Sequence, residues 1–253
     1  MAILTTKTLG ALFGILGNAV AVGVFLSPGP TFYRIYKRKS SEGYKSLPYS
    51  VALFSAMMLL YYGSLKPNGI LLITINSFGC FIELLYLTIF VVYSLKETKR
   101  STLKLLILFN MGGISLVLLL TGLLTKGTKR IEAVGWINAV INICVFAAPL
   151  SVMRQVIKTR SVEFMPITLT LALNLNAIMW FFYGFFTNDY YIAGPNILGF
   201  LLGMAQTILY IIYKYCIGKV EQDPTDQKPT KDSNLSSVDN VIKDKQQIDL
   251  QIV

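Results

Sequence analysis

Long stretches without a charged side chain are the feature that most restricts how this chain of 253 residues can fold. Six windows contain no Lys, Arg, Asp or Glu, and a seventh is interrupted by Glu83 alone. Each is close to the roughly 20 residues that a helix needs to cross the apolar core of a bilayer. The windows are 8–33, 46–65, 67–95, 105–125, 133–153, 164–188 and 190–213.

Seven such windows cannot all be core helices of a water-soluble protein, because too little polar surface would remain. Only 14% of the residues are charged, against about 25% in soluble domains. The sequence therefore predicts an all-α membrane protein with seven transmembrane helices. We expect these helices near residues 9–26, 47–64, 70–93, 104–124, 133–152, 166–187 and 192–213. The first window also fits the apolar part of a secretory signal peptide, but the repeat described below requires it as a helix.

The basic residues predict the orientation of the chain. The net charge is +10, which alone could suggest binding to nucleic acid. However, the basic residues gather in alternate loops, at 34–45, 96–104 and 154–160. The positive-inside bias then places the N-terminus outside and the C-terminus in the cytosol, so we expect membrane lipid and no nucleic acid as a partner. The tail, 217–253, mixes both charges and lacks aromatic residues, which predicts a disordered cytosolic segment.

The chain contains an internal repeat. When residues 14–63 are compared with residues 135–184, eleven of fifty positions are identical, where roughly three would match by chance. The segments MLLYYG (58–63) and MWFFYG (179–184) are part of this match. After a slip of one residue, Asn76 corresponds to Asn196. The first three helices therefore recur as the last three.

This repeat predicts the domain organisation. We expect a first three-helix unit at 1–95, a linker helix at 96–126 and a second unit at 127–216. Because the linker helix restores the starting side of the membrane, the two bundles run parallel to each other. Two related bundles that face each other can open their seam to alternate sides and hold a substrate near the midplane.

Amides inside the apolar windows are the first candidates for a substrate site, because an amide in a bilayer must find a partner and so points inward. Asn76 and Asn196 are a repeat pair that symmetry places on both walls of the seam, where amides suit a neutral polyol. Ser55 and Asn176 form a second pair, and Asn142 lies in the fifth window. The alternative is hydrogen bonding between helices. We expect that alternative for Asn18, Asn138 and Asn174.

Trp180 and its repeat counterpart Leu59 are candidates for contact with the flat face of a substrate. Trp180 lies inside its window, away from the membrane interface where tryptophan usually anchors a helix. Its ring could stack on the apolar face of a sugar, although ordinary packing is the alternative. The register of the repeat predicts that the two side chains approach the substrate from opposite bundles.

Four prolines are expected at helix ends on the cytosolic side. We predict that Pro28 and Pro149 end the first and fifth helices, and that Pro48 and Pro166 begin the second and sixth. Proline has no backbone N–H and stops or bends a helix. Four prolines at related positions suggest hinges of a cytosolic gate, while ordinary helix termini remain the alternative.

Two acidic residues are candidates for function. Glu83 is the only acid inside a window, and an acid in the membrane is a functional candidate by default. Because the chain has no histidine, we expect a structural hydrogen-bonding role for Glu83 rather than a proton relay. Asp189 lies in an external loop and, with Tyr61, could close an external gate or simply be solvated. The sequence predicts no cofactor, no metal site and no enzymatic activity.

Five motifs, in this order over residues 8–215, resemble the plant SWEET sugar transporters, also called the MtN3/saliva family, and in particular the subgroup associated with sucrose export. They are PTFYRIYKRKSSEGYKSLPYSVALFSAM, LLITINSFGC, FAAPLSVMRQVIKTRSVEFMP, WFFYG and PNILGF. The resemblance implies bidirectional, facilitated movement of sucrose or hexoses by alternating access, without proton coupling. It also implies a plasma-membrane protein that forms homo-oligomers.

The resemblance also implies roles for particular residues. The sugar pocket would be lined by Asn76, Asn196, Trp180, Ser55, Asn142, Val145 and Asn176. The cytosolic gate would be formed by Pro28, Pro48, Pro149 and Pro166, and the external gate by Tyr61 and Asp189. Two positions depart from the family pattern, because Leu59 stands where a tryptophan is usual and Asn176 where a small serine is expected. Both changes reshape the pocket.

Two other classes of protein share part of this pattern. A proton-coupled carrier of small solutes is the nearer alternative. A seven-helix receptor has the same number of helices but has no need of a three-helix repeat with a linker. Transport of labelled sugar with and without a pH gradient separates these possibilities.

Overall fold

The computed structural model describes residues 5–162 and 165–217, and in these ranges the chain forms helices and short turns without a strand. From residue 218 on, the predicted disordered tail lies outside the described residues. The α-helices are α1 (Thr6–Leu26), α2 (Gly29–Arg38), α3 (Leu47–Leu65), α4 (Ile70–Val92), α5 (Lys96–Leu105), α6 (Gly113–Leu124), α7 (Thr128–Val145), α8 (Ala147–Thr159), α9 (Ile167–Phe186) and α10 (Tyr190–Ile211). Two π-helical segments are η1 (Leu106–Gly112) and η2 (Ile212–Ile217).

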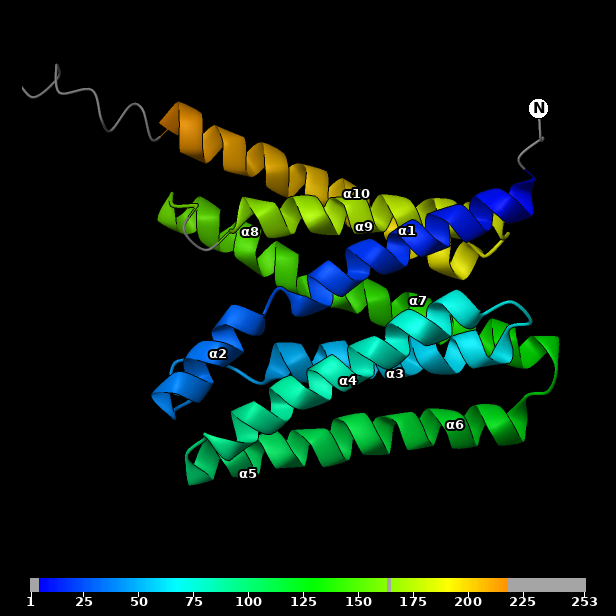
Figure 1. Cartoon of the computed structure of the whole chain (residues 1–253), viewed down its shortest axis with the longest axis horizontal. Helices are drawn as coiled ribbons and strands as arrows, with labels where there is room; N and C mark the ends of the chain where they lie inside the picture. Colours follow the sequence, from blue (N-terminus) through cyan, green and yellow to red (C-terminus); the bar gives the residue numbers. More distant parts are fainter. Residues whose placement is uncertain (1–4, 163–164, 218–253) are drawn as a thin grey trace, which may run out of the picture.

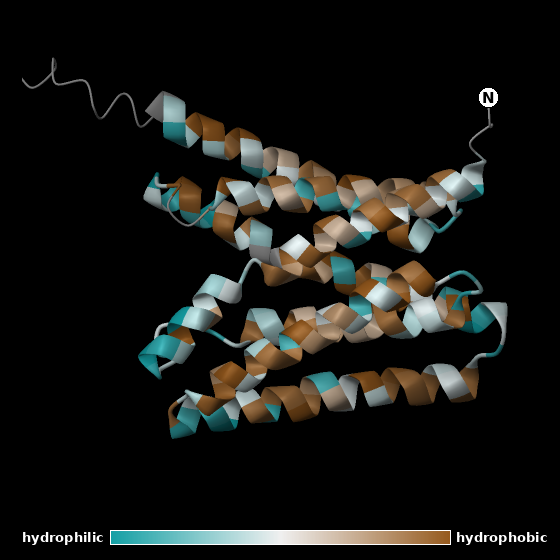
Figure 2. Ribbon diagram, in the orientation of Figure 1, coloured by the Kyte–Doolittle hydropathy of each residue, from teal (hydrophilic) through white to brown (hydrophobic). Residues whose placement is uncertain are grey.

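The all-helical fold is confirmed, and in the described residues it contains seven long helical segments, one for each predicted span. Six helical runs of the described chain are long and apolar enough to cross a membrane, beginning with α1, α4, α5, α7, α9 and α10. The seventh is α3, a helix of 19 residues. Several of its polar side chains bind neighbouring helices, as described below. Figure 2 shows the apolar residues along the spans and the hydrophilic ones at the two ends of the molecule.

The helices form two parallel bundles, as the repeat predicts (Figure 1). In the first bundle α4 packs against both α1 and α3, and in the second α10 packs against both α7 and α9. The bundles meet where α1 lies along α9 and where α3 lies along α7. One end of the molecule carries the start of α1, and we call it the N-terminal end; the other carries α2, α5 and α8, and we call it the basic end.

The linker helix, built from α5, η1 and α6, lies against α3. Polar side chains join the two along their length, because a hydroxyl or amide within a membrane must find a partner in a neighbouring helix. These pairs are Ser46–Thr102, Ser50–Asn110 and Tyr61–Thr121. The linker helix is thereby attached to the first bundle.

The first helix breaks where Pro28 follows it, as predicted. Pro28 has no N–H, so the carbonyl of Val24 loses its usual helical donor. Ser27 replaces that donor, with its backbone N–H 3.2 Å and its hydroxyl 2.7 Å from the Val24 oxygen. The chain then turns into α2.

The fifth predicted helix, at 133–152, differs from the structure. It is divided into α7 and α8, and Pro149 lies in the first turn of α8 rather than at the end of α7. The physical reason is the same as in the first bundle, because the missing N–H of Pro149 deprives the carbonyl of Val145 and ends the helix one turn earlier. Pro48 lies in the first turn of α3 and Pro166 caps the start of α9, as predicted.

Candidate substrate site

A cavity of about 470 Å³ lies between the two bundles. All eight residues that the sequence predicts for the substrate site line it, together with one of the four prolines, Pro149. Residues of α1, α3, α4, α7, α8, α9 and α10 contribute to its wall. The eight are Asn76, Asn196, Trp180, Ser55, Leu59, Asn142, Val145 and Asn176.

The two repeat asparagines are held in the same way. The Nδ2 of Asn76 donates to the carbonyl of Leu72 at 2.9 Å, and the Nδ2 of Asn196 donates to the carbonyl of Ile192 at 2.7 Å. Each bond spans four residues of its own helix and fixes the side chain against the wall. Within the described residues neither Oδ1 accepts a hydrogen bond, so both amides keep an acceptor for a molecule in the cavity.

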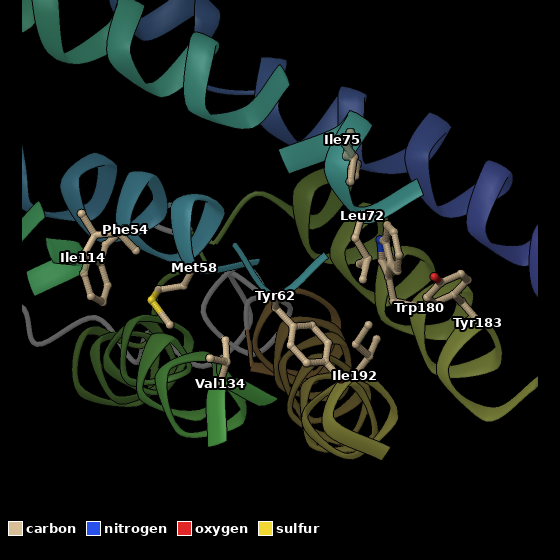
Figure 3. Packing of buried hydrophobic residues seen from close by; sticks show 11 residues of the cluster. Phe54, Met58, Tyr62, Leu72, Ile75, Ile114, Val134, Trp180, Tyr183 and Ile192 are labelled. Atoms are coloured by element: carbon tan, nitrogen blue, oxygen red, sulfur yellow. The ribbon is translucent and has the colours of Figure 1, made fainter. Parts of the chain in front are cut away.

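The aromatic part of the wall is Trp180. It is buried, and its ring lies edge-on to Tyr183 with 5.2 Å between ring centroids. Figure 3 shows it beside Leu72, another residue of the cavity wall. A methyl group added at Gly17 of α1 would lie 3.1 Å from Cε2 of the indole, so the glycine allows α1 to approach the ring closely.

The remaining amides of the wall differ in their partners. Ser55 donates to Oδ1 of Asn142 at 3.5 Å, which joins α3 of the first bundle to α7 of the second. The Nδ2 of Asn142 donates to the carbonyl of Asn138 at 2.8 Å. The Oδ1 of Asn176 is buried without a hydrogen-bond partner in the described structure. Because it is enclosed, this oxygen is not open to a molecule in the cavity in this conformation, although Asn176 lines the cavity wall.

Three asparagines join helices, which confirms their predicted role. Asn18 donates to Thr74 at 3.0 Å, and Asn138 donates to the carbonyl of Met58 at 3.3 Å. Asn174 donates to Thr207 at 3.4 Å. Of the three, only Asn138 links the first bundle to the second.

Asp189 is closed off at the N-terminal end of the molecule, and its partners differ from the expected one. Its side chain is 0% exposed. It accepts a hydrogen bond from the hydroxyl of Tyr62 at 2.9 Å and forms an ion pair with Lys66. Both partners belong to the first bundle, whereas Asp189 precedes α10 of the second. This end of the seam is therefore held together by a buried carboxylate.

Tyr61, which the sequence paired with Asp189, points elsewhere. Its hydroxyl lies 2.8 Å from Oγ1 of Thr121 and accepts a hydrogen bond from Nε of Arg130, also at 2.8 Å. Thr121 uses its own proton on the carbonyl of Val117, so Tyr61 is the donor to Thr121. The reason for the difference is helical geometry, since neighbouring residues point about 100° apart around the axis.

Glu83 does not have the expected hydrogen-bonding role. It is buried in α4, yet it makes no hydrogen bond within the described residues, and its Oε2 is fully enclosed. It does not line the cavity. The prediction of a structural hydrogen bond is therefore wrong for this structure.

Two phenylalanines and a glutamine of the cavity wall were not predicted from the sequence. Phe25 and Phe146 are a repeat pair, and each ring lies over the glycine of another pair, Gly79 and Gly199. A methyl group at Gly79 would stand only 2.4 Å from Cζ of Phe25. Because the same residue types occur at corresponding positions of both units, the repeat could have identified them as candidates. Gln206 had no such signal, because it has no identical counterpart.

Two related bundles around a polar and aromatic cavity, joined at one end by a buried carboxylate, define a membrane carrier of the parallel-repeat class. The family described as "Sugar efflux transporter for intercellular exchange" matches residues 11–98 and 132–217. The chain belongs to this family, the MtN3/SWEET family. The parallel arrangement of two repeat units is a known property of this family, and this chain shares it.

Individual relatives agree with this assignment. The chain is 54% identical to the bidirectional sugar transporter SWEET9 of Arabidopsis thaliana over 228 residues, which are 90% of this chain and 87% of the relative. It is 58% identical to the bidirectional sugar transporter NEC1 of Petunia hybrida over 214 residues, 85% of this chain and 80% of the relative. The 3.7 Å structure of a eukaryotic SWEET transporter aligns with a TM-score of 0.77 at 35% identity, covering 82% of this chain and 98% of that one.

Proposed function

We propose that this protein is a bidirectional, facilitative transporter of sugar that works by alternating access. The observation that carries the proposal is the cavity between the two bundles, with an asparagine from each unit and a tryptophan in its wall. Amides that donate and accept, together with a flat ring, suit a neutral molecule with many hydroxyl groups and an apolar face. The relatives named above, which are bidirectional sugar transporters by name, support this reading.

The substrate is sucrose, hexose or both. The wall contains the uncharged residues Ser55, Asn142, Asn176 and Asn196, and no charged residue lines the cavity in the described structure. On the first-bundle side of this wall, Leu59 stands at the position that corresponds to Trp180 in the repeat, so this side has no flat ring there. The pocket therefore contacts the substrate asymmetrically, with Trp180 providing the aromatic surface.

The N-terminal end faces the outside and the basic end faces the cytosol, in the plasma membrane. The basic loops around α2, α5 and α8 support this orientation through the positive-inside bias. During transport the two three-helix units, residues 1–95 and 127–216, move against each other. The linker helix at 96–126 moves with the first unit. Surrounding lipid and further copies of this chain are its partners in the membrane.

We propose that, in this orientation, the conformation is an inward-open state. Among the described residues, several hydrogen bonds and an ion pair that connect the two bundles lie at the external side and the middle of the seam. They are Ser55–Asn142, Met58–Asn138, Tyr61–Arg130, Tyr62–Asp189 and Lys66–Asp189. We propose that Asp189 with Tyr62 and Lys66 forms the external gate.

The cytosolic gate is formed by Pro28, Pro48, Pro149 and Pro166. Each lies at a helix start of the basic end, and the breaks after α1 and α7 provide places where the helices can bend. Because a break without its backbone hydrogen bond resists bending less than a continuous helix does, these positions can act as hinges.

Reconstituted protein tests the proposal directly. Proteoliposomes are loaded with sucrose, glucose or fructose, and labelled sugar is followed in both directions with and without a pH gradient. We expect flux down the sugar gradient only, at rates that an uncoupler does not change. Accumulation driven by the pH gradient would instead identify the proton-coupled carrier.

A further inference from the structure

Gln206 of α10 is a polar residue of the cavity wall that the proposed sugar site does not use. Only 8% of its surface is exposed, and it lines the cavity. In the described part of the chain its amide makes no hydrogen bond. Its amide atoms are not sealed off from the cavity, so they can donate to and accept from a molecule inside it. This residue therefore calls for a function.

The position of Gln206 follows from the face of α10 that borders the cavity. Asn196, Gly199, Gly203 and Gln206 all lie on that face. Gln206 lies about 15 Å from Asn196 along the helix axis, toward the basic end. Between the two amides, Gly199 lies against Phe146 and Gly203 lies against Asn174, and both glycines also line the cavity. The two polar points are thus connected by one continuous strip of the cavity wall.

Comparison of the two units explains why the side chain of Gln206 has no hydrogen-bond partner among the described residues. With the offset that pairs the central asparagines, Gln206 corresponds to Tyr86. The hydroxyl of Tyr86 donates to the carbonyl of Phe25 at 3.2 Å, where α1 ends. In the second unit the corresponding carbonyl of Phe146 accepts from the backbone N–H of Leu150 at 3.2 Å. The side chain at position 206 is therefore not needed to stabilise the helix break.

The amides of the cavity are also unevenly distributed. Asn142, Asn176, Asn196 and Gln206 belong to the second unit, whereas the first unit contributes only Asn76. A molecule that leaves the centre toward the basic end therefore keeps amide contacts along the second unit alone.

We propose that Gln206 binds the hydroxyl groups of the sugar at the cytosolic end of the cavity, as a second contact point between Asn196 and the cytosol. This rests on the proposed function and names a further residue that recognises the substrate. The ligand is a neutral, hydroxyl-bearing molecule, since an amide donates and accepts without favouring a charge. The contact exists while the cytosolic end is open.

The binding test uses the fluorescence of Trp180. The chain has two tryptophans, so Trp136→Phe in the full-length protein leaves Trp180 as the only one. Sucrose and glucose are titrated separately. We expect Gln206→Leu to raise the Kd by about two- to tenfold, which corresponds to the net contribution of a hydrogen bond. Gln155→Leu, on the exposed face of α8, is the matched control and should leave the Kd unchanged.

A second background tests whether the contact depends on conformation. Asp189→Ala removes the carboxylate that Tyr62 and Lys66 share in the external gate and favours the outward-open state. In that background Gln206→Leu should change the Kd less than about twofold. Gel filtration checks that each variant is folded, and Gln206→Met replaces Gln206→Leu if the latter aggregates.

Two results would overturn the proposal. One is an unchanged Kd in the Gln206 variant, and the other is an equal loss in both backgrounds, which indicates a general structural effect. Failure of the proposed function would look different from both results, because the wild-type protein itself would then transport no sugar in proteoliposomes.

Discussion

Replacing Tyr62 with Phe tests the external gate, because it removes one hydroxyl and leaves the ring in place. The hydroxyl donates to the buried carboxylate of Asp189 at 2.9 Å. A hydrogen bond to a charged group contributes about 1.5–3 kcal/mol. If the bond forms only in the inward-open state, its loss shifts the equilibrium toward the outward-open state about 10- to 100-fold.

Labelling of a cavity cysteine measures this shift. Leu59→Cys provides the target in a background without the three native cysteines, Cys80, Cys144 and Cys216, and a membrane-impermeant thiol reagent is applied from outside. We expect Tyr62→Phe to accelerate labelling at least about tenfold, in line with that shift. Lys66→Met should act in the same direction.

Tyr61→Phe is the matched comparison, because it removes the neighbouring hydroxyl. That hydroxyl binds Thr121 and Arg130 and has no contact with Asp189. We expect a smaller change in labelling than for Tyr62→Phe. Faster labelling of Tyr61→Phe together with a wild-type rate for Tyr62→Phe would refute the assignment and restore the pairing of Tyr61 with Asp189.

Three further predictions concern the cavity and its gate. Asn76→Ala and Asn196→Ala should each lose hydroxyl contacts of about 1–3 kcal/mol and nearly abolish sugar uptake while surface expression persists; normal uptake in both would remove them from the substrate site. Trp180→Ala should abolish transport, whereas Leu59→Trp should gain about 0.5–1.5 kcal/mol of aromatic contact and raise sugar affinity or shift the sucrose-to-glucose preference. Concentration series for both sugars measure this, and unchanged values for Leu59→Trp would mean that position 59 contributes packing alone. Pro48→Ala should slow the transport cycle in exchange assays without loss of folded protein, because it releases the backbone φ angle that proline fixes in the first turn of α3, and an unchanged rate would reduce Pro48 to a helix terminus.

The two units are similar in backbone and different in detail. At the basic end of the first bundle, Phe32 stacks on Tyr86 with 4.3 Å between ring centroids, within a cluster that also contains Ile35, Ile82 and Phe90. The first bundle therefore has its own core at the basic end. The second bundle instead presents amides to the cavity.

The sequence by itself determined the seven helices and the two units. A bilayer requires every backbone polar group to be satisfied within its own helix, so charge-free windows of sufficient length have few alternatives. The repeat then related positions in one unit to positions in the other. For this reason the amino-acid sequence alone is enough to assign the paired residues Asn76 and Asn196 to the same cavity.

Only the tertiary structure decided which side chains meet. The sequence places Tyr61 and Tyr62 together at the end of α3, but the rotation of the helix determines that Tyr62 reaches Asp189 and that Tyr61 reaches Arg130. The structure also shows that Gln206 has no hydrogen-bond partner among the described residues, and that the carbonyl of Phe146 accepts from the backbone N–H of Leu150 instead. Periodicity shows which residues share a face, whereas packing between helices sets the direction in which that face points.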